Sequence, residues 1–501
     1  MSLNLISWMI FLPFLGAISQ IFLPGRGKWA ALAASILSAC CGTALILGMD
    51  PAVSDLQAVE ILPWVGSYSI TYEVGMDGLN ALLVLLISWV MPVLIAAEWK
   101  QKKGVAGMHA LFLILQASLL GAVCAQDLFL VFFFWALSAV PMYFLIGIWG
   151  GDDRESASFR TLVVSAIGNA FFFGALILIY YSFEPHTFSL KELAGGKFAG
   201  KTFHFLDWDL PVPLLAFSLM SLGLALRTPI WPLHGWFTVF AQQSPLSVFV
   251  AVSSVMTAVA SYLFVKLSFS LFPETISATS QGIVAVGLLN LIAGGLGALS
   301  QKNLRTLLSF VCIGEVGIAL VGYGSLNSVG IVGAVFQLLS LGLGIAGFGL
   351  FINVLNERKG STDFLKEGTG TTVTGTLGGI AVQAPGVAVV AAIMTGTLLG
   401  FPGVSGFIGH SLLVMGSYSV HPIAVVVTVG AFFMATFYFF TMYRHVFLGK
   451  AQDSSVMEDL NFREKLYLLP LVFLVIWFGI YPKPLIDLIR PTVLTLLSTI
   501  K

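Results

Sequence analysis

The chain has 501 residues, of which 57% are hydrophobic and only 10% are charged, and it carries 24 basic and 24 acidic side chains. With a mean hydropathy of +0.95, this composition excludes a soluble globular protein and predicts a polytopic membrane protein. The balanced charge gives no sign of a nucleic-acid partner. The four cysteines form no Cys-x-x-Cys pair and lie in or beside apolar segments, so we expect no disulfide framework.

The apolar segments predict an all-α fold that crosses the membrane about fourteen times, because roughly 20 helical residues span a hydrocarbon core about 30 Å thick. The predicted spans are residues 5–23, 30–48, 78–97, 108–125, 127–149, 161–182, 211–227, 245–270, 281–299, 304–322, 327–354, 378–400, 421–442 and 466–482. Arg26 and Lys28 follow the first span instead of preceding it, so we expect a retained helix and not a cleaved signal peptide. No linker or low-complexity tract divides the chain, which predicts a single membrane domain over residues 1–501.

The basic residues of the loops predict the orientation of the chain. If the N-terminus faces outward, sixteen of the 24 Lys and Arg residues fall in inward loops and six fall in outward segments. This excess satisfies the positive-inside rule, and it places both termini on the outer side of the membrane.

Prolines and glycines interrupt two of the predicted spans, the seventh and the twelfth. The seventh passes through TPIWP directly after Arg227, and the twelfth passes through GFPGVSGFIGH at 400–410. Helices four to eight (108–270) and nine to thirteen (281–442) would then form two five-helix repeats, inverted because five is odd, each with one broken helix. A break persists only against protein or a wet cavity, so the pair indicates the ion path. The alternative is that prolines and glycines are simply common in transmembrane helices.

Four motifs resemble the antiporter-like subunits of respiratory complex I, and most closely the M subunit, which is chain 4 in mitochondria. They are FLVFFFWALSAVPMYFLIGIWG at 129–150, TPIWPLHGW at 228–236, SQKNLRTLLSFVCIGEVG at 300–317 and FPGVSGFIGHSLLVMGSY at 401–418. The resemblance covers most of the chain, and it implies proton movement driven by quinone reduction in other subunits. Multisubunit cation/proton antiporters and membrane-bound hydrogenases carry related subunits, so the motifs do not separate these machines.

The resemblance also implies a chain of buried relay residues, and this sequence departs from nearly all of them. In the first repeat, Ala136 stands for the family's glutamate of helix five and Arg227 for its lysine of helix seven. Ala258 stands for the lysine of helix eight when the two sequences are aligned at Tyr262. In the second repeat, Glu315 and Leu341 stand for the histidines of helices ten and eleven, and His410 stands for the glutamate of helix twelve. Three of these family relay positions, Ala136, Ala258 and Leu341, therefore carry no titratable group.

Arg227 takes the place of the family's central lysine. A guanidinium with a pKa above about 12 effectively never deprotonates in a protein, so Arg227 cannot relay a proton by releasing one. A central charge costs about 3 kcal/mol, so we expect compensation from carbonyls freed at the Pro229 break, from water, or from a carboxylate of a neighbouring subunit. The first repeat is predicted to be inactive as a proton channel of the family type.

Glu315 and His410 are the titratable candidates of the second repeat. The two substitutions exchange the family's histidine and glutamate, which predicts a Glu–His pair if their helices are neighbours. Histidine, with a reference pKa near 6.5, is a competent relay group. The alternative is a hydrogen-bonded core histidine and a glutamate at a wet boundary.

The sequence predicts a position or a local role for five further polar residues. Asp127 is predicted to cap helix five, and His109 is predicted to lie at the membrane interface. Lys266 is predicted to extend its amine outward, and Arg305 fits a basic position of the family. His234, in the His-Gly-Trp motif, is expected to have a structural or gating role.

The sequence contains no Gly-rich phosphate loop and no metal-ligand spacing, so we expect no cofactor, no metal and no redox chemistry on this chain. The resemblance implies that partner subunits bind NADH, flavin, iron–sulfur clusters and quinone. The expected partners are other membrane-arm subunits, including further antiporter-like subunits, in a bacterial inner membrane. Within such a complex the chain either moves protons through Glu315 and His410 or acts as a structural spacer. The competing hypothesis is a subunit of a cation/proton antiporter, a hydrogenase-linked pump or an ion-coupled uptake complex.

Overall fold

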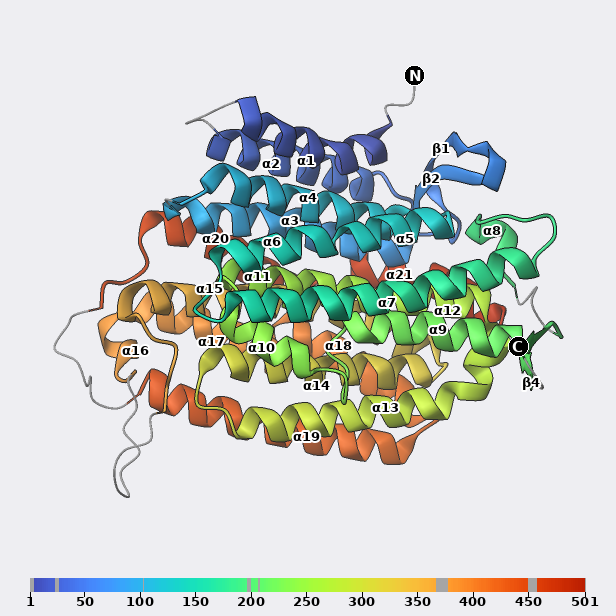
Figure 1. Cartoon of the computed structure of the whole chain (residues 1–501). Helices are drawn as coiled ribbons and strands as arrows, with labels where there is room; N and C mark the ends of the chain where they lie inside the picture. Colours follow the sequence, from blue (N-terminus) through green and yellow to red (C-terminus); the bar gives the residue numbers. More distant parts are fainter. Residues whose placement is uncertain are drawn as a thin grey trace.

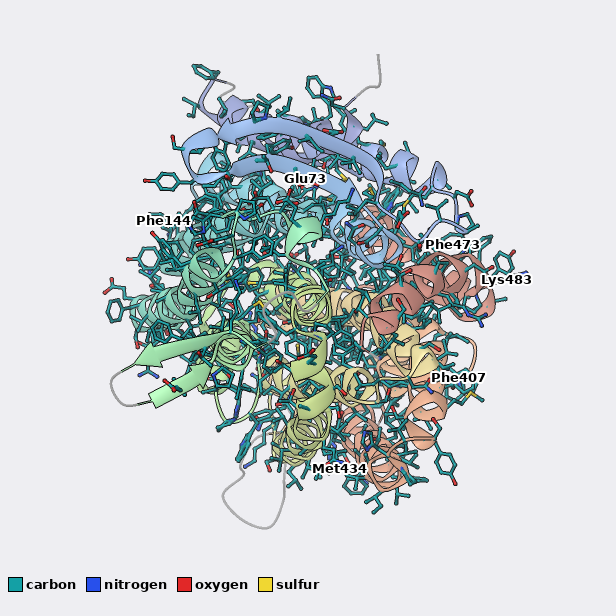
Figure 2. The ribbon with its side chains drawn as sticks, turned by 90° about the vertical axis from the view of Figure 1, so that its right-hand side faces the viewer. Glu73, Phe144, Phe407, Met434, Phe473 and Lys483 are labelled. Carbon is teal, nitrogen blue, oxygen red and sulfur yellow. The ribbon has the colours of Figure 1, made fainter. Side chains whose placement is uncertain are left out.

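The computed structural model describes residues 4–22, 27–101, 103–195, 200–205, 208–365, 377–448 and 457–500. Its principal helices are α1 Leu5–Phe22, α2 Gly27–Leu47, α3 Gly78–Ala97, α4 Val105–Cys124, α5 Leu128–Leu137, α6 Ala139–Trp149, α7 Arg154–Ser182, α9 Val212–Arg227, α10 Gly235–Gln243, α11 Leu246–Val250, α12 Thr257–Leu271, α13 Pro273–Leu299, α14 Leu304–Gly324, α15 Ser328–Lys359, α17 Pro385–Leu399, α18 Ser405–Tyr418, α19 Pro422–Val446, α20 Phe462–Ile480 and α21 Lys483–Ser498. Most of them lie side by side in one bundle, with α1 and α2 on one flank and α13 and α19 on the other (Figure 1). Viewed along the bundle, side chains fill the space between the helices, and the exposed Phe144 and Phe473 lie at the perimeter (Figure 2).

The helices confirm a polytopic membrane fold. Eleven of the described segments are long and apolar enough to cross a membrane, or twelve if α20 and α21, which are bent by 70°, form one span. The shorter apolar helices α9 and α17 lie at the predicted seventh and twelfth spans, and each ends where the sequence predicts a break. The number of fourteen spans and the repeats at 108–270 and 281–442 stay predictions.

Several elements between the spans were not anticipated from the sequence. β1 (Gln57–Val65) pairs antiparallel with β2 (Ile70–Met76), and β3 (Thr202–Phe205) pairs with β4 (Trp208–Pro211). The short helices α8 (Leu190–Leu193) and α16 (Ile380–Gln383) lie in the same kind of segment. These pieces satisfy backbone hydrogen bonds locally. Inside the eighth predicted span, a π-helical turn at Ala251–Met256 joins α11 to α12.

The end of the bundle that carries the β1–β2 hairpin (residues 57–76) is named here the hairpin end, and the first and last helices both contact it. Glu60 of β1 accepts hydrogen bonds from the backbone N–H groups of Ile6 (2.9 Å) and Ser7 (3.1 Å), at the start of α1. Thr492 of α21 accepts a 3.2 Å hydrogen bond from the backbone N–H of Gly78, where α3 follows β2. The start of α1 and the middle of α21 therefore lie at this end of the bundle, and the side of the membrane that each terminus faces stays a prediction. Part of the basic set behind that orientation lies outside the described residues, namely Arg26, Lys102, Lys197, Lys366, Lys450 and Lys501.

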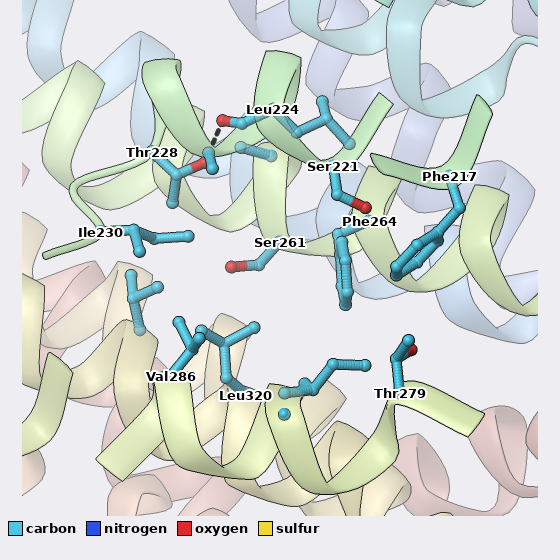
Figure 3. A pocket seen from close by; sticks show the side chains of 15 residues that line it. Phe217, Ser221, Leu224, Thr228, Ile230, Ser261, Phe264, Thr279, Val286 and Leu320 are labelled. Carbon is cyan, nitrogen blue, oxygen red and sulfur yellow. Dashed lines mark hydrogen bonds between the residues drawn. The ribbon is translucent and has the colours of Figure 1, made fainter. Parts of the chain in front are cut away.

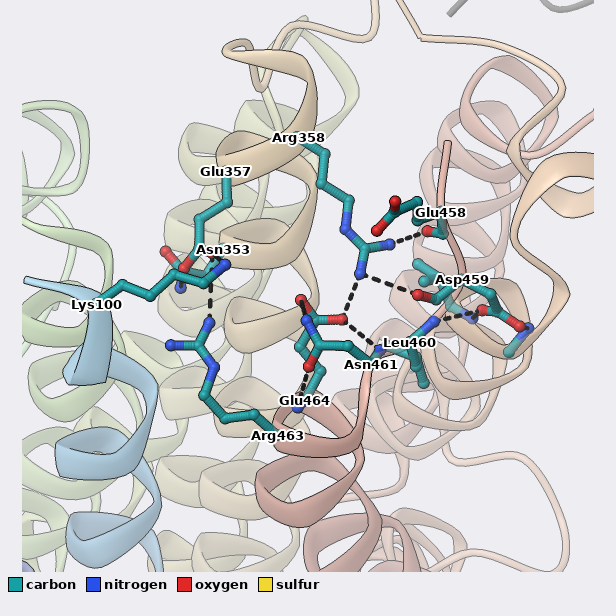
Figure 4. A network of polar contacts seen from close by, with 12 residues as sticks. Lys100, Asn353, Glu357, Arg358, Glu458, Asp459, Leu460, Asn461, Arg463 and Glu464 are labelled. Carbon is teal, nitrogen blue, oxygen red and sulfur yellow. Dashed lines mark hydrogen bonds and ion pairs between the residues drawn. The ribbon is translucent and has the colours of Figure 1, made fainter. Parts of the chain in front are cut away.

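An ion-pair network joins α15 and α20 to the residues after α3 at the opposite end of the bundle (Figure 4). Glu357 pairs with Lys100 at 2.9 Å and with Arg463 at 3.5 Å, and Arg358 pairs with Glu464. Several charges that share partners hold their side chains in place better than an isolated surface pair does. The network fixes the first turn of α20 against the last turn of α15.

Candidate functional site

The first helix break follows Arg227. The chain is non-helical from Thr228 to His234 before α10 begins. Pro229 and Pro232 carry no backbone N–H, so neither can continue the helical hydrogen-bond ladder. The break thus fixes Arg227 as the last residue of α9, inside the bundle.

Arg227 is 1% exposed, and neutral groups surround its guanidinium. Its Nη1 donates to the carbonyl of Trp135 at 2.6 Å and to Oδ1 of Asn169 at 3.3 Å. Its Nη2 donates to Oγ of Ser138 at 2.7 Å. The guanidinium carbon lies 4.1 Å from the centroid of the Trp135 ring, which is a cation–π contact. Within the described ranges Arg227 pairs with no carboxylate.

The partners of Arg227 therefore come from the junction of α5 and α6 and not from the Pro229 break. The helix is interrupted at Ser138, whose hydroxyl donates to the carbonyl of Trp135 at 2.7 Å. Both of these oxygens also accept from the guanidinium. Ala136, the aligned position of the family's glutamate, lies in the same turn and offers no charge.

A close approach of α7 and α9 brings Asn169 to Arg227. A Cβ on Gly168 would lie 2.8 Å from the carbonyl oxygen of Gly223, and a Cβ on Gly223 would lie 2.7 Å from that of Gly168. Small residues of this kind let membrane helices pack backbone against backbone. The sequence places these glycines, but only the crossing of the two helices explains them.

The second cluster joins α14, α15 and α18. His410 Nε2 lies 3.2 Å from Glu315 Oε2. The amide nitrogen of Gln337 lies 2.9 Å from both Glu315 Oε2 and His410 Nε2. All three side chains are buried. His410 Nε2 donates to Glu315 in one tautomer and accepts from Gln337 in the other, so one arrangement accommodates two proton positions.

Two glycines make room for this cluster beside the second helix break. A Cβ on Gly409 would lie 2.2 Å from Gln337 Oε1, so α18 packs against α15 only with glycine there. Gly400 has φ +70°, and a Cβ on it would lie 2.4 Å from His410 Nδ1. The backbone at the break between α17 and α18 therefore packs directly against the imidazole of His410.

Gln337 is the member of the cluster that sequence reasoning missed. Leu341, the aligned position of the family's histidine, is buried one turn further along α15 and is apolar. The available signal was an amide within a span that is otherwise almost entirely apolar and glycine-rich. A polar side chain at such a position is costly unless it is paired, which marks it as a candidate.

The remaining predicted positions lie apart from the two clusters. His234 precedes α10, its Nδ1 is buried without a partner among the described residues, and its ring meets Phe310 edge-on at 6.1 Å. Ala258 is buried and apolar on α12. Tyr262, one turn further, donates from its hydroxyl to the carbonyl of Val123 at 3.2 Å.

One of the local predictions is wrong and one is confirmed. His109 is fully buried, with no hydrogen bond to its ring among the described residues, and does not reach an interface. Lys266 pairs with Asp77, the carboxylate at the start of α3, and its side chain is 12% exposed. Asp127 caps α5 by accepting from two backbone N–H groups. Arg305 donates to the carbonyl of Ser244 at 3.1 Å.

An apolar pocket of about 320 Å³ lies beside the first break (Figure 3). Its lining comes from α9, α12, α13 and α14, and Thr228 closes one side by donating to the carbonyl of Leu224 at 2.8 Å. Arg227 does not line it. The described parts of the chain also contain no group of three or more His, Cys, Asp and Glu side chains that could hold a metal ion. The expectation that cofactors reside on other chains stays a prediction.

Comparisons with known proteins place this arrangement in a family. The family model described as "NADH:quinone oxidoreductase/Mrp antiporter, TM" matches residues 125–435. NADH-quinone oxidoreductase subunit M of Rhodobacter capsulatus is 28% identical, over 98% of this chain and 96% of that protein. NAD(P)H-quinone oxidoreductase chain 4 of Gloeobacter violaceus is 27% identical, over 98% of this chain and 92% of that protein.

Solved structures share the fold over almost the whole chain. A chain of respiratory complex I from Thermus thermophilus superposes with a TM-score of 0.87 at 22% identity, covering 99% of this chain and all of that one. A chain of the Mrp complex from Dietzia superposes with a TM-score of 0.84 at 19% identity, covering 99% and 98%. Since the family model covers more than half of the chain, the protein belongs to the NADH:quinone oxidoreductase/Mrp antiporter family of membrane subunits.

Proposed function

We propose that the chain is a membrane-arm, antiporter-like subunit of a complex I-type NADH:quinone oxidoreductase and that it takes part in redox-coupled proton translocation. The observation that carries the proposal is the contact of Glu315 with His410 across the 3.2 Å gap that Gln337 bridges. Relatives named subunit M or chain 4 match the chain along almost its full length, which supports the choice of complex.

The second half of the chain would carry the proton. A carboxylate and an imidazole that share one hydrogen-bonded cluster can hold a proton on either group. Burial excludes bulk water from the cluster, so a proton enters or leaves only when a neighbouring element moves. The break between α17 and α18, which closes over His410 at Gly400, is the element best placed to move.

The first half would not carry a proton through Arg227. A guanidinium keeps its proton, and here it is fixed by two carbonyl or amide oxygens, a hydroxyl and an indole ring. The proposed role of Arg227 is a fixed positive charge that holds α5, α7 and α9 together.

The proposal extends to the surroundings of the chain. Partner subunits of the membrane arm, including further antiporter-like subunits, would flank it, and NADH, flavin, iron–sulfur clusters and quinone would bind to partner chains. The membrane would be a bacterial inner membrane, with the hairpin end facing outward. The Mrp complex shares the fold, so a multisubunit cation/proton antiporter is the alternative assembly.

The first test is to purify the tagged chain in mild detergent and identify its partners by mass spectrometry. Co-purification of NADH-oxidising and quinone-site subunits is the expected result. Recovery with antiporter subunits alone, or with an unrelated enzyme, would show that the complex I assignment is wrong.

The second test uses the purified complex in vesicles and measures protons moved per NADH oxidised. Glu315→Gln combined with His410→Gln removes both titratable groups and is expected to abolish the share of transport that this subunit contributes. Glu155→Gln, at an exposed position of α7, is the matched control and should leave transport unchanged. Unchanged coupling in the double variant would instead make the chain a structural spacer.

A further inference from the structure

A buried ion pair at the hairpin end lies apart from both clusters. The ammonium of Lys266, on α12, contacts Oδ2 of Asp77, and their side chains are 12% and 3% exposed. Oδ1 of Asp77 accepts from the backbone N–H groups of Leu79 (2.9 Å) and Asn80 (2.8 Å), which caps α3. The carboxylate is therefore held by the backbone, and the flexible lysine is the member of the pair that can move.

Two neutral titratable side chains interact electrostatically with Asp77, namely Cys124 of α4 and Tyr262 of α12. Tyr262 is already bonded to the carbonyl of Val123. Among the described residues, Lys266 forms an ion pair with Asp77, and its side chain is 12% exposed.

Lys266 differs from Arg227 in the one property that proton transfer needs. A lysine ammonium loses its proton readily when it is buried and its carboxylate moves away, whereas a guanidinium does not. Lys266 lies eight residues beyond Ala258 on α12, which is about 12 Å along a helix. The chain thus places a lysine near the hairpin end, at a position that none of the aligned relay residues occupies.

We propose that Lys266 and Asp77 form the proton-exchange site of this chain at the hairpin end. In each cycle an N–H bond of the Lys266 ammonium breaks, its electron pair stays on Nζ, and the proton passes to water at that end. Asp77 stabilises the protonated amine, so lengthening their contact favours release, and re-forming it favours uptake of the next proton. The inference rests on the proposed function, because a proton must reach Lys266 from inside the membrane.

The test substitutes Lys266 in the assembled complex in vesicles and measures protons moved per NADH oxidised. Lys266→Arg keeps the positive charge and the ion pair but cannot release a proton. We expect this variant to assemble and to oxidise NADH, while the protons moved by this subunit are lost. Lys100→Arg, at the exposed ion pair with Glu357 at the opposite end of the bundle, is the matched control and should not reduce transport. If Lys266→Arg transports like the unmodified chain while Lys266→Gln does not, the pair is a structural clamp and the inference is wrong.

A second measurement uses the unmodified chain, so it does not depend on how a variant folds. Only a neutral amine reacts with acetic anhydride, and mass spectrometry of peptides reports the acetylated fraction of each lysine. Acetylation of Lys266 should rise at least twofold during turnover relative to the resting complex. Lys100, which is 63% exposed, serves as the reference and should not change. Equal acetylation of Lys266 in both states would overturn the proposal.

The two failures are distinguishable. If the proposed function is wrong, the chain does not co-purify with NADH-oxidising subunits. Failure of the inference appears in a complex that oxidises NADH and moves protons, with Lys266→Arg indistinguishable from the unmodified chain.

Discussion

The side-chain carbonyl of Asn290 accepts a 2.6 Å hydrogen bond from the backbone N–H of Trp231. The amide nitrogen of the same residue donates to the carbonyl of Ile313, also at 2.6 Å. Trp231 lies in the break that follows Arg227, and Ile313 lies two residues before Glu315. One buried side chain of α13 therefore connects the first helix break to the turn of α14 that precedes Glu315.

Replacing Asn290 by leucine should destabilise the protein by about 1–3 kcal/mol, because the partly buried backbone N–H of Trp231 would lose its acceptor and the carbonyl of Ile313 would lose a donor. Thermal unfolding in detergent measures the change. Asn353→Leu is the control, since the Asn353 amide bonds to Glu357 near the surface and should lose much less. Equal losses in the two variants would contradict a special role for Asn290.

Gly400→Ala should lower both stability and coupled transport. A Cβ at this position would lie 2.4 Å from His410 Nδ1, and the backbone has φ +70°, which L side chains rarely adopt. We expect a loss of more than about 1 kcal/mol and a displaced imidazole. Gly430→Ala is the control, because nothing lies within 4 Å of its Cβ position in α19. The melting temperature and the proton transport of both variants are the measurements. Equal losses in Gly400→Ala and Gly430→Ala would contradict the close contact of Gly400 with His410.

Gln337→Leu should slow coupled transport roughly tenfold or more, which corresponds to losing a hydrogen bond to a charged group worth about 1.5–3 kcal/mol. Glu315 and His410 would keep their direct contact, so the pair would still form but without its shared donor. Proton transport per NADH oxidised is the measurement. Gln116→Leu, a buried glutamine of α4 that accepts from Ser35, tests whether losing any buried amide has the same effect.

Arg227→Lys together with Ala136→Glu should add one transported proton per turnover. The double change supplies a releasable cation and a carboxylate in the turn that already contacts Arg227. Arg227→Lys alone should not add a proton, because its neighbours are neutral. Proton-to-electron ratios of the three forms test this, and an unchanged ratio in the double variant would mean that the first half lacks more than these two groups.

The hydrogen bonds of Asp459, which lies outside the predicted spans, predict that the stability of the protein depends on pH. Burial alone would raise the pKa of its carboxyl group, but hydrogen bonds from the backbone N–H groups of Leu460, Gly386 and Val387 outweigh it and lower the pKa. Because the folded-state pKa is below the unfolded value of about 3.9, the stabilisation is complete at higher pH and is lost as the pH falls through the folded pKa. The difference in melting temperature between the unmodified chain and Asp459→Asn should therefore be present at pH 7 and should shrink as the pH falls below the unfolded pKa of about 3.9. A difference independent of pH would contradict the carboxylate's role.

The spans and breaks were predictable because their causes are local. An apolar run of about 20 residues is stable as a helix in lipid wherever its neighbours lie, since lipid itself covers its surface. The break after Arg227 follows from Pro229 and Pro232, which lack the N–H that a helix needs. The terminal helix α21 escaped this reasoning because its sequence alternates apolar and polar residues and does not form a continuous apolar run.

Sequence alone also identified the membrane fold, the family resemblance, the loss of titratable groups at Ala136, Ala258 and Leu341, and the inability of Arg227 to release a proton. Only the tertiary structure decided which groups meet. Arg227 finds partners 58, 89 and 92 residues away, and Gln337 joins Glu315 and His410 across 22 and 73 residues. The contact of Lys266 with Asp77 spans 189 residues. Such contacts depend on how closely helices cross, which backbone packing at glycines sets, and a pattern read along one helix does not contain that distance.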